Sequence, residues 1–385
     1  MSLPDPIALA QSLIRCPSVT PADEGAMDVL ERALAGLGFT CIRLKLGHPP
    51  DGPVDNLIAT LAGRQQGLGG PHFAFAGHSD VVPAGDLAGW SEDPFAGAVK
   101  NGFVVGRGAA DMKGALAAMI AAAARHIGRG PLVGRLTFII TGDEEGPATF
   151  GTAPLLDWLE ANELVPDLCL VGEPTSQITL GDMMKIGRRG SVNAWITVNG
   201  AQGHVGYPHM ADNPITRLIA IMAELQARVL DTGNDWFQAS NLEITDVSVG
   251  NTATNLIPAQ ARARLNIRFN NEHSGTSLSD WIRSVVTAHA PSSHVEIKIS
   301  GEAFLTQPGA LSSLVSAAIA DVTGRTPELS TTGGTSDARF IRRLCPVVEF
   351  GLPGQSMHKV DEHAAVADIE GLTAIYEAVL ARALA

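Results

Sequence analysis

The sequence predicts an α/β protein with a mostly parallel sheet flanked by helices, into which a smaller α+β domain is inserted. In the first and last parts of the chain, helical periodicity alternates with short, continuously apolar runs, which is typical of strands buried on both faces. In the middle, apolar and polar residues alternate, as they do in half-buried strands. We therefore predict a discontinuous larger domain, residues 1–188 and 303–385, and an inserted domain, residues 189–302.

The elements of the larger domain follow from these patterns. Helices are predicted near residues 5–15, 24–37, 113–127, 310–322 and 367–384. Strands are predicted at Phe73–Ala76, Leu136–Ile140, Leu168–Val171 and Pro346–Phe350, and a glycine-rich loop at Gly67–Pro71. The longest apolar stretch, Gly114–Ala124, is too short to span a bilayer, so we expect a buried helix there.

The inserted domain has its own order of elements. Alternating residues predict strands near 192–198, 242–249, 261–269 and 295–299, and helices near 213–230 and 277–289. The resulting order, strand-helix-strand-strand-helix-strand, is the ferredoxin-like signature.

Composition excludes several functional classes. Of 385 residues, 45% are apolar, which is enough for a large core, and the net charge of −13 argues against binding to nucleic acid or to an anionic membrane. An anionic substrate therefore needs a local cluster of positive charge. The four cysteines follow no metal-binding or disulfide pattern, and no secretory signal is recognisable, so we expect a reducing cytoplasm.

Acidic and histidine residues directly follow three of the predicted strands. His78 and Asp80 follow the first strand, Asp143–Glu145 the second and Glu173 the third. Ligands in open α/β sheets gather at the carboxyl ends of strands. Each residue alone has an ordinary explanation, as a core histidine, a helix cap or a solvated turn. Together they indicate a site for two divalent metals, which need carboxylate and imidazole ligands, a bridging group and a base.

Five motifs connect the chain with a known family. They are GRGAADMKG at 106–114, GRRGS at 187–191, GHVGYPH at 203–209, GGTSDARF at 333–340 and MHKVDE at 357–362. Over nearly its whole length the chain resembles the dinuclear zinc metallopeptidases and deacylases that include aminoacylases and glutamate carboxypeptidases. No serine-hydrolase elbow, P-loop or HExxH motif competes with this interpretation.

The resemblance implies a metal centre with assigned roles. It implies two Zn²⁺ per subunit, with Co²⁺ possible in the second site. Asp111 would bridge the ions, with His78 and Glu173 on one ion and Glu145 and His358 on the other. Asp80 would orient His78, and Glu144 would be the general base, taking a proton from the attacking water and passing it to the leaving amine.

The inserted domain would complete the site in a homodimer. By resemblance, it is a dimerisation and lid domain, and His204 stabilises the oxyanion in the partner subunit's site. A surface histidine in a glycine-rich turn is the alternative. Arg188 and Arg268 are candidates for binding substrate carboxylates, although Arg268 also fits a solvated strand face. Further substrate contacts are expected from Ser191, Tyr207, Asn255, Gly334 and Thr335.

The activity that the resemblance implies is hydrolysis of N-succinyl-L,L-2,6-diaminopimelate to succinate and L,L-2,6-diaminopimelate, in lysine and diaminopimelate biosynthesis. One alternative is deacylation of another N-acyl amino acid, such as N-acetylornithine. The other is a non-catalytic, metal-dependent binding protein. Glu144 argues against the binding protein, because a binding site needs no base that activates water.

Overall fold

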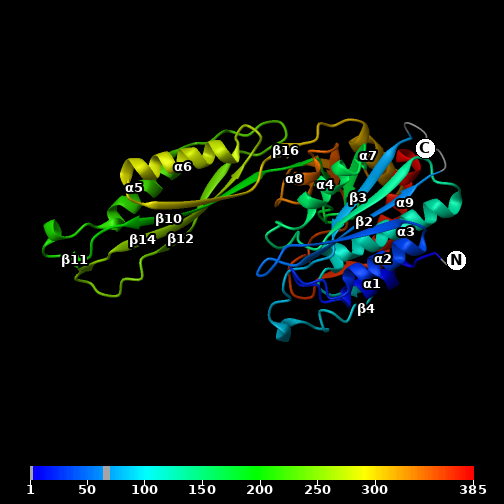
Figure 1. Ribbon diagram of the computed structural model, residues 1–385, viewed down its shortest axis with the longest axis horizontal. Helices are drawn as coiled ribbons and strands as arrows, with labels where there is room; N and C mark the ends of the chain where they lie inside the picture. Colours follow the sequence, from blue (N-terminus) through cyan, green and yellow to red (C-terminus); the bar gives the residue numbers. More distant parts are fainter. Residues whose placement is uncertain (1–2, 64–69) are drawn as a thin grey trace. The chain divides into compact units, whose positions relative to one another are not determined.

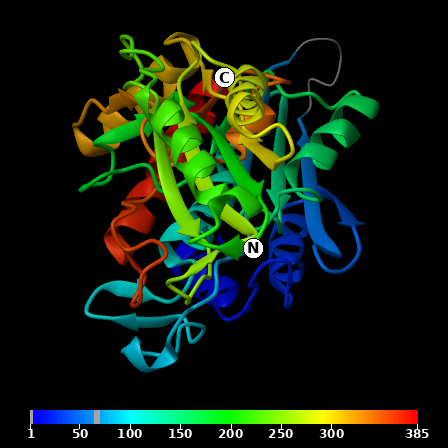
Figure 2. The same ribbon diagram turned by 90° about the vertical axis from the view of Figure 1, so that its left-hand side faces the viewer.

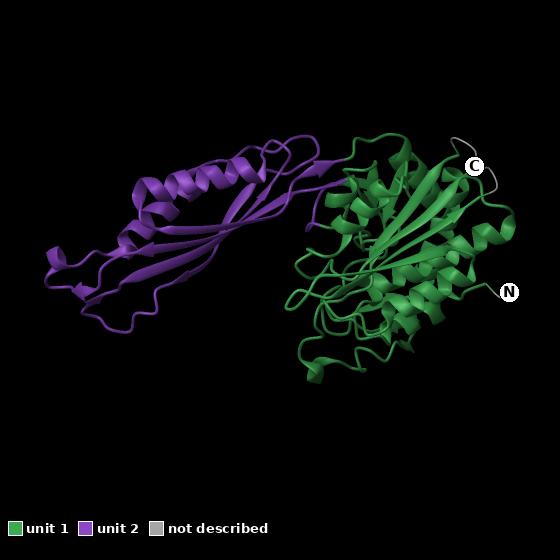
Figure 3. Ribbon diagram, viewed as in Figure 1, with its two compact units in different colours: residues 1–186, 306–330, 336–385 green, residues 187–305, 331–335 purple. Residues whose placement is uncertain are grey.

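The computed structural model describes residues 3–63 and 70–385, so the loop predicted at Gly67–Pro71 lies mostly outside the described residues. The chain forms two compact units, coloured separately in Figure 3. Unit 1 comprises residues 1–186, 306–330 and 336–385, and unit 2 comprises residues 187–305 and 331–335.

Unit 1 is built on an eight-stranded sheet with the order β1-β2-β6-β3-β7-β18-β8-β17. The strands are β1 (Thr40–Leu46), β2 (Val54–Ala62), β6 (Arg135–Thr141), β3 (His72–His78), β7 (Leu168–Val171), β18 (Val347–Glu349), β8 (Met183–Lys185) and β17 (Glu328–Ser330). The four central strands, β6, β3, β7 and β18, run parallel. The β1–β2, β2–β6 and β18–β8 pairs are antiparallel, so the sheet is mixed. The predicted α/β class is confirmed.

Helices lie on both sides of this sheet (Figure 1). They are α1 (Pro6–Ile14), α2 (Ala26–Gly36), α3 (Gly114–Arg129), α4 (Thr152–Ala161), α7 (Ala310–Thr323), α8 (Ala338–Ile341) and α9 (Val366–Ala383). The alanine-rich α3 packs against α9, and its residues from Gly114 to Ala124 are all buried, as predicted. Strands β4 (Ala98–Lys100), β5 (Phe103–Val105) and β19 (His363–Ala365) form a small separate sheet. Within the described ranges, no helix is long and apolar enough to cross a membrane.

Unit 2 contains a four-stranded antiparallel sheet with the order β12-β14-β10-β15. The strands are β12 (Asn241–Ser248), β14 (Gln260–Phe269), β10 (Gly190–Asn199) and β15 (His294–Gly301). Helices α5 (Pro214–Ala227) and α6 (Gly275–His289) pack together over one face (Figure 2). Alternate residues of β10 and β14 enter this core, as the sequence pattern predicts. The predicted ferredoxin-like arrangement is confirmed.

Two short strand pairs lie at the ends of unit 2. Strand β9 (Gly187–Arg188) pairs with β16 (Phe304–Leu305), and β11 (Gly203–His204) pairs with β13 (Leu256–Ile257). Within unit 2, β11 and β16 lie at opposite ends of the sheet (Figure 1).

Candidate metal centre

The central strands of unit 1 bring acids and histidines to one edge of the sheet. His78 is the last residue of β3, and Asp80 follows it. Glu144 and Glu145 follow β6, and Glu173 follows β7. Because β6, β3 and β7 are parallel neighbours, their carboxyl ends meet.

Two loops complete the set. Asp111 comes from the irregular segment Ala109–Lys113 that precedes α3, and His358 comes from the loop between β18 and β19. His358 has a φ of +60°, a left-handed conformation that is uncommon for a residue with a side chain.

The Asp111 carboxylate lies between the two histidines. Its Oδ1 is 3.2 Å from His78 Nε2, and its Oδ2 is 3.3 Å from His358 Nε2. Glu173 Oε1 is 3.8 Å from the same His78 nitrogen, and Glu145 Oε1 is 2.8 Å from His358 Nε2. Each oxygen of Asp111 therefore faces a different histidine and carboxylate pair, which is the arrangement that a bridging ligand needs.

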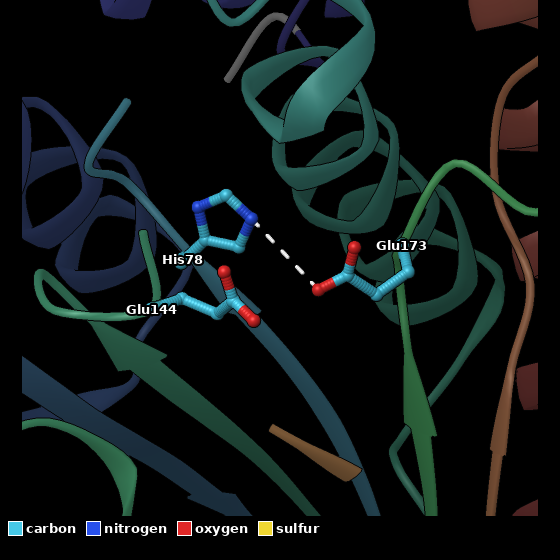
Figure 4. Close-up of side chains that lie close together, drawn as sticks. All are labelled: His78, Glu144 and Glu173. Atoms are coloured by element: carbon cyan, nitrogen blue, oxygen red, sulfur yellow. Dashed lines mark ion pairs between the residues drawn. The ribbon is translucent and has the colours of Figure 1, made fainter. Parts of the chain in front are cut away.

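Glu144 also lies close to this group. Ligand atoms of His78, Glu144 and Glu173 all lie within 4.8 Å of one another, and so do those of His78, Asp111 and Glu145. Figure 4 shows Glu144 and Glu173 beside the His78 ring. Proximity alone does not distinguish a base from a ligand here, so the role of Glu144 rests on its chemistry.

Asp80 holds the turn that carries two of the acids. Its carboxylate, fully buried, accepts hydrogen bonds from the backbone N–H groups of Glu144 (3.2 Å) and Glu145 (3.0 Å). The nearer partner of His78 Nδ1 is the backbone carbonyl of Asp80 at 3.0 Å, because the Asp80 carboxylate is 3.7 Å away, beyond hydrogen-bond distance. In this structure Asp80 therefore orients His78 through its backbone.

The electrostatics of the cluster favour bound cations. Burial opposes a charge on His78, but its hydrogen bond to Asp111 and the nearby carboxylates raise its pKa well above the ordinary value. Hydrogen bonds to Asp111 and Glu145 raise the pKa of His358 to about 10. Both imidazoles are thus drawn towards the charged form by surplus negative charge. Divalent metals would neutralise that charge, and carboxylate and imidazole donors fit zinc.

The residues predicted to bind substrate lie in unit 2, where some gather near its β9–β16 end. Ser191 of β10 stands opposite Arg268 of β14 in register, and its buried hydroxyl accepts a hydrogen bond from Asn266. The buried Arg188 donates from Nη1 to the carbonyl of Thr332 at 3.4 Å, beside Gly334 and Thr335 of the same segment. Positive charge is concentrated here. Burial is the larger cause of the lowered pKa of Arg189, and the nearby charge of Arg268 is the second cause.

The other predicted residues lie at the opposite end of unit 2. The exposed His204 ring accepts a hydrogen bond at Nδ1 from the Gly206 N–H, and it lies 5.6 Å from the Tyr207 ring. The Asn255 carbonyl accepts from the Val205 N–H. Strand β10 runs from Gly190 to Asn199, so its two ends lie roughly 30 Å apart at about 3.3 Å per residue. Within one unit 2, the structure does not bring His204 together with Arg268.

Two buried residues near the centre had no predicted role. Glu362 accepts a hydrogen bond from the Asp111 N–H, and the Asp337 charge contributes to the raised pKa of Glu144. Both residues lie inside quoted motifs, MHKVDE and GGTSDARF. Motif position could have selected them, whereas their burial and partners are visible only in the folded chain.

A mixed α/β sheet that gathers acids and histidines at its strand ends is the arrangement expected of a metal-dependent hydrolase. The chain belongs to peptidase family M20/M25/M40, whose family model matches residues 74–382.

Relatives in this family are similar over nearly their full length. A succinyl-diaminopimelate desuccinylase of Rhizorhabdus wittichii is 61% identical over 99% of this chain and 98% of that protein. One of Gluconacetobacter diazotrophicus is 56% identical over 98% of this chain and 96% of that protein.

Solved structures support the fold. Aminopeptidase PepT of Bacillus cereus matches with a TM-score of 0.79 at 21% identity, covering 98% of this chain and 99% of that one. The Bacillus subtilis YXEP protein, described as a dinuclear metal binding peptidase from the M20 family, matches with a TM-score of 0.69 at 20% identity, covering 98% and 96%.

Proposed function

We propose that this protein hydrolyses N-succinyl-L,L-2,6-diaminopimelate to succinate and L,L-2,6-diaminopimelate, in lysine and diaminopimelate biosynthesis. The observation that carries the chemistry is the Asp111 carboxylate, which faces a histidine and a carboxylate on each side. The names of relatives at 54–61% identity support the choice of substrate.

In this proposal the centre holds two Zn²⁺, with Co²⁺ possible in the second site. His78 and Glu173 would bind one ion, and Glu145 and His358 would bind the other. Asp111 would bind both ions. When bound, the ions would polarise the scissile carbonyl and make the attacking water more acidic. Surplus carboxylate charge around two imidazoles supports this ligand set.

Glu144 is the proposed general base. Burial first, and then the charge of Glu173, raise the pKa of its carboxyl well above the ordinary value. A carboxylate with a raised pKa holds a proton more readily, so Glu144 could accept one from the attacking water and return it to the leaving amine. This chemistry distinguishes Glu144 from the neighbouring ligands.

Unit 2 supplies the proposed contacts to substrate. Arg188 and Arg268 would bind its carboxylates, since guanidinium groups pair with carboxylates through two parallel hydrogen bonds. Ser191, Gly334 and Thr335, which lie at the same end of unit 2, would add polar contacts.

His204 would act in the partner subunit of a homodimer, with Tyr207 and Asn255 beside it. Because Gly206 donates to Nδ1, the neutral ring carries its proton on Nε2, where it can be donated to an oxyanion. The separation of His204 from Arg268 along β10 supports action in trans, because one small substrate cannot reach both residues of a single unit 2. Unit 2 is thus the proposed dimerisation and lid domain, and unit 1 the catalytic domain.

The four cysteines are free, which suits the reducing cytoplasm that we propose as the site of action.

Amide cleavage by the zinc-loaded protein tests the proposal, with N-succinyl-L,L-2,6-diaminopimelate and N-acetylornithine as parallel substrates. We expect strong preference for the succinyl compound, loss of activity on chelation and recovery with Zn²⁺. Activity on the acetyl compound alone would move the assignment to another deacylase. Tight metal binding without turnover of either substrate would favour a binding protein.

A further inference from the structure

A buried ion pair contacts the backbone beside several of the candidate metal ligands. Arg107 Nη1 donates to Glu362 Oε2 at 2.7 Å, and the two residues are 2% and 0% exposed. Neither residue belongs to the proposed ligand set. A buried ion pair of this kind adds little net stability, so its position in the fold deserves an explanation.

Glu362 fixes the segment that carries Asp111. Besides Arg107, its carboxylate accepts three backbone hydrogen bonds: Gly108 N–H donates to Oε2 at 3.0 Å, and Ala110 N–H (3.0 Å) and Asp111 N–H (3.1 Å) donate to Oε1. The segment is irregular, because Asp111 and Met112 have non-helical φ/ψ, and a π-type hydrogen bond from the Lys113 N–H to the Gly108 carbonyl (2.9 Å) spans it. The Glu362 carboxylate thus accepts the backbone N–H groups of this segment up to and including that of the proposed bridging ligand.

Arg107 forms hydrogen bonds with two further loops, those that carry His358 and Asp80. Its Nη1 also donates to the backbone carbonyl of Lys359, the residue after His358, at 3.2 Å. Its Nη2 donates at 3.2 Å to the carbonyl of Pro83, in the loop that follows His78 and Asp80. The guanidinium lies over the Trp90 ring, 5.3 Å from its centroid.

We propose that the Arg107–Glu362 pair is a positioning device that sets the spacing of three ligand loops, those of His78, Asp111 and His358. The inference rests on the proposed metal centre. Groups that orient metal ligands typically contribute about 10–100-fold to metal affinity or activity, and this pair contacts backbone beside three ligands at once. Its loss loosens the spacing between Asp111 and the two histidines.

Metal binding to the folded protein tests the device. Metal-free wild type, Glu362→Gln and Arg107→Lys are titrated with Co²⁺, followed by visible absorption, and their Zn²⁺ affinities are measured by competition with a chelator. Gln keeps the shape of Glu but replaces one acceptor oxygen with a donor. Lys keeps the charge but lacks the planar fork that reaches several acceptors. We expect about 10–100-fold weaker Zn²⁺ binding and a changed Co²⁺ spectrum for both variants.

Glu377→Gln is the matched control. Glu377 is also an almost buried acid, and its Oε1 lies 2.5 Å from Arg129 Nη2, but that pair joins α9 to the end of α3. The control should keep wild-type affinity and spectrum while losing an ion pair. Circular dichroism and thermal unfolding check that each variant is folded.

The outcomes separate this inference from the proposed function. If wild type binds neither Co²⁺ nor Zn²⁺, the metal centre itself is wrong and the inference fails with it. If wild type binds and both folded variants match it in affinity and spectrum, only the positioning role fails. Failure of both variants to fold even with saturating Zn²⁺ would make the pair a folding requirement and would also overturn the role.

Discussion

The two units present their candidate residues in opposite ways. In unit 1 the acids and histidines of the candidate metal centre contact one another, and most of them are buried. In unit 2 the candidate residues form two groups at opposite ends of one sheet, and His204 and Tyr207 face solvent. Unit 1 therefore presents a preorganised candidate centre, whereas the two groups of candidate residues in unit 2 do not contact each other.

The contrast follows from secondary structure. Parallel neighbouring strands bring their carboxyl ends to one edge, so residues distant in the sequence meet there without further help. An antiparallel sheet brings consecutive strands back and forth, and the residues at its two ends stay a full strand length apart. The same kind of polar residue is therefore easier to interpret in unit 1 than in unit 2.

Replacing the proposed base in unit 1 should have the largest effect. Glu144→Gln keeps the size of the side chain but cannot accept the proton, so kcat should fall about 10²–10⁴-fold while two metals stay bound. Steady-state kinetics and metal analysis of the same sample measure both quantities. Loss of one metal equivalent would instead make Glu144 a ligand, as its distances to His78 and Glu173 also permit.

A somewhat smaller loss is expected at the exposed end of unit 2. His204→Ala removes one proposed oxyanion donor, so kcat should fall about 10²–10³-fold with metal content unchanged. Mixing this variant with Glu144→Gln under subunit exchange tests action in trans. Random pairing should restore about one quarter of wild-type activity, because half of the dimers then hold one intact site. No recovery in proven mixed dimers would exclude a site shared between subunits.

The other end of unit 2 should affect binding more than chemistry. Arg268→Lys keeps the charge but loses the paired hydrogen bonds to a carboxylate, so KM should rise roughly 10-fold with kcat nearly unchanged. Arg262→Lys is the control, since Arg262 lies on the same strand and is exposed. If both variants had the same KM, Arg268 would be an ordinary residue of a solvated strand face and not a substrate ligand.

The smallest effect on activity is expected for a buried histidine of unit 1 outside the centre. His72 Nδ1 donates to the Val165 carbonyl at 3.0 Å, and Nε2 accepts from the Thr137 hydroxyl at 2.8 Å, so the ring is held neutral. Burial, and then the charge of Arg135, lower its pKa from 6.5 to about 4. As pH falls, the unfolded chain takes up this proton before the folded chain does. The stability that neutral His72 contributes is therefore present above pH 6.5 and is lost as pH falls towards 4.

The slope from this single proton is at most about 1.4 kcal/mol per pH unit. His72→Asn should therefore reduce the pH dependence of the free energy of unfolding between pH 4 and 6.5, as measured by denaturant titration. It should leave kcat unchanged. His48→Asn, at an exposed position, should keep the wild-type slope. An unchanged slope in His72→Asn would mean that His72 does not titrate differently in the folded chain.

Much of the fold could be predicted because burial leaves a pattern. Continuous apolar runs marked β3, β6 and β7, and alternation marked the strands of unit 2. The β1–β2 hairpin was not predicted, because most residues of β1 are only half-buried and no clear period appears. The membership of residues 331–335 in unit 2 also left no local signal, since it depends on contacts such as that between Thr331 and Trp236.

The candidate site divides in the same way. The acids that follow strands could be recognised from position alone, whereas the roles of Asp111 and His358 needed the family resemblance, because irregular segments carry these two candidates. The partners of Asp80 and Glu362 are backbone N–H groups, which no side-chain pattern reveals. Sequence could therefore indicate which residues belong to the centre, but not which groups hold them in place.

Because unit 1 is discontinuous in the sequence, its candidate metal ligands are synthesised at widely separated times. His358 is encoded after the whole of unit 2, so translation at about 5–20 residues per second separates it from His78 by roughly 15–60 s. After Glu173 has been synthesised and until His358 is added, the nascent chain carries Asp111, Glu145 and Glu173 without the second histidine. The complete candidate centre can form only after His358 has been synthesised, so a nascent chain that stops before this residue should bind metal more weakly than the whole chain.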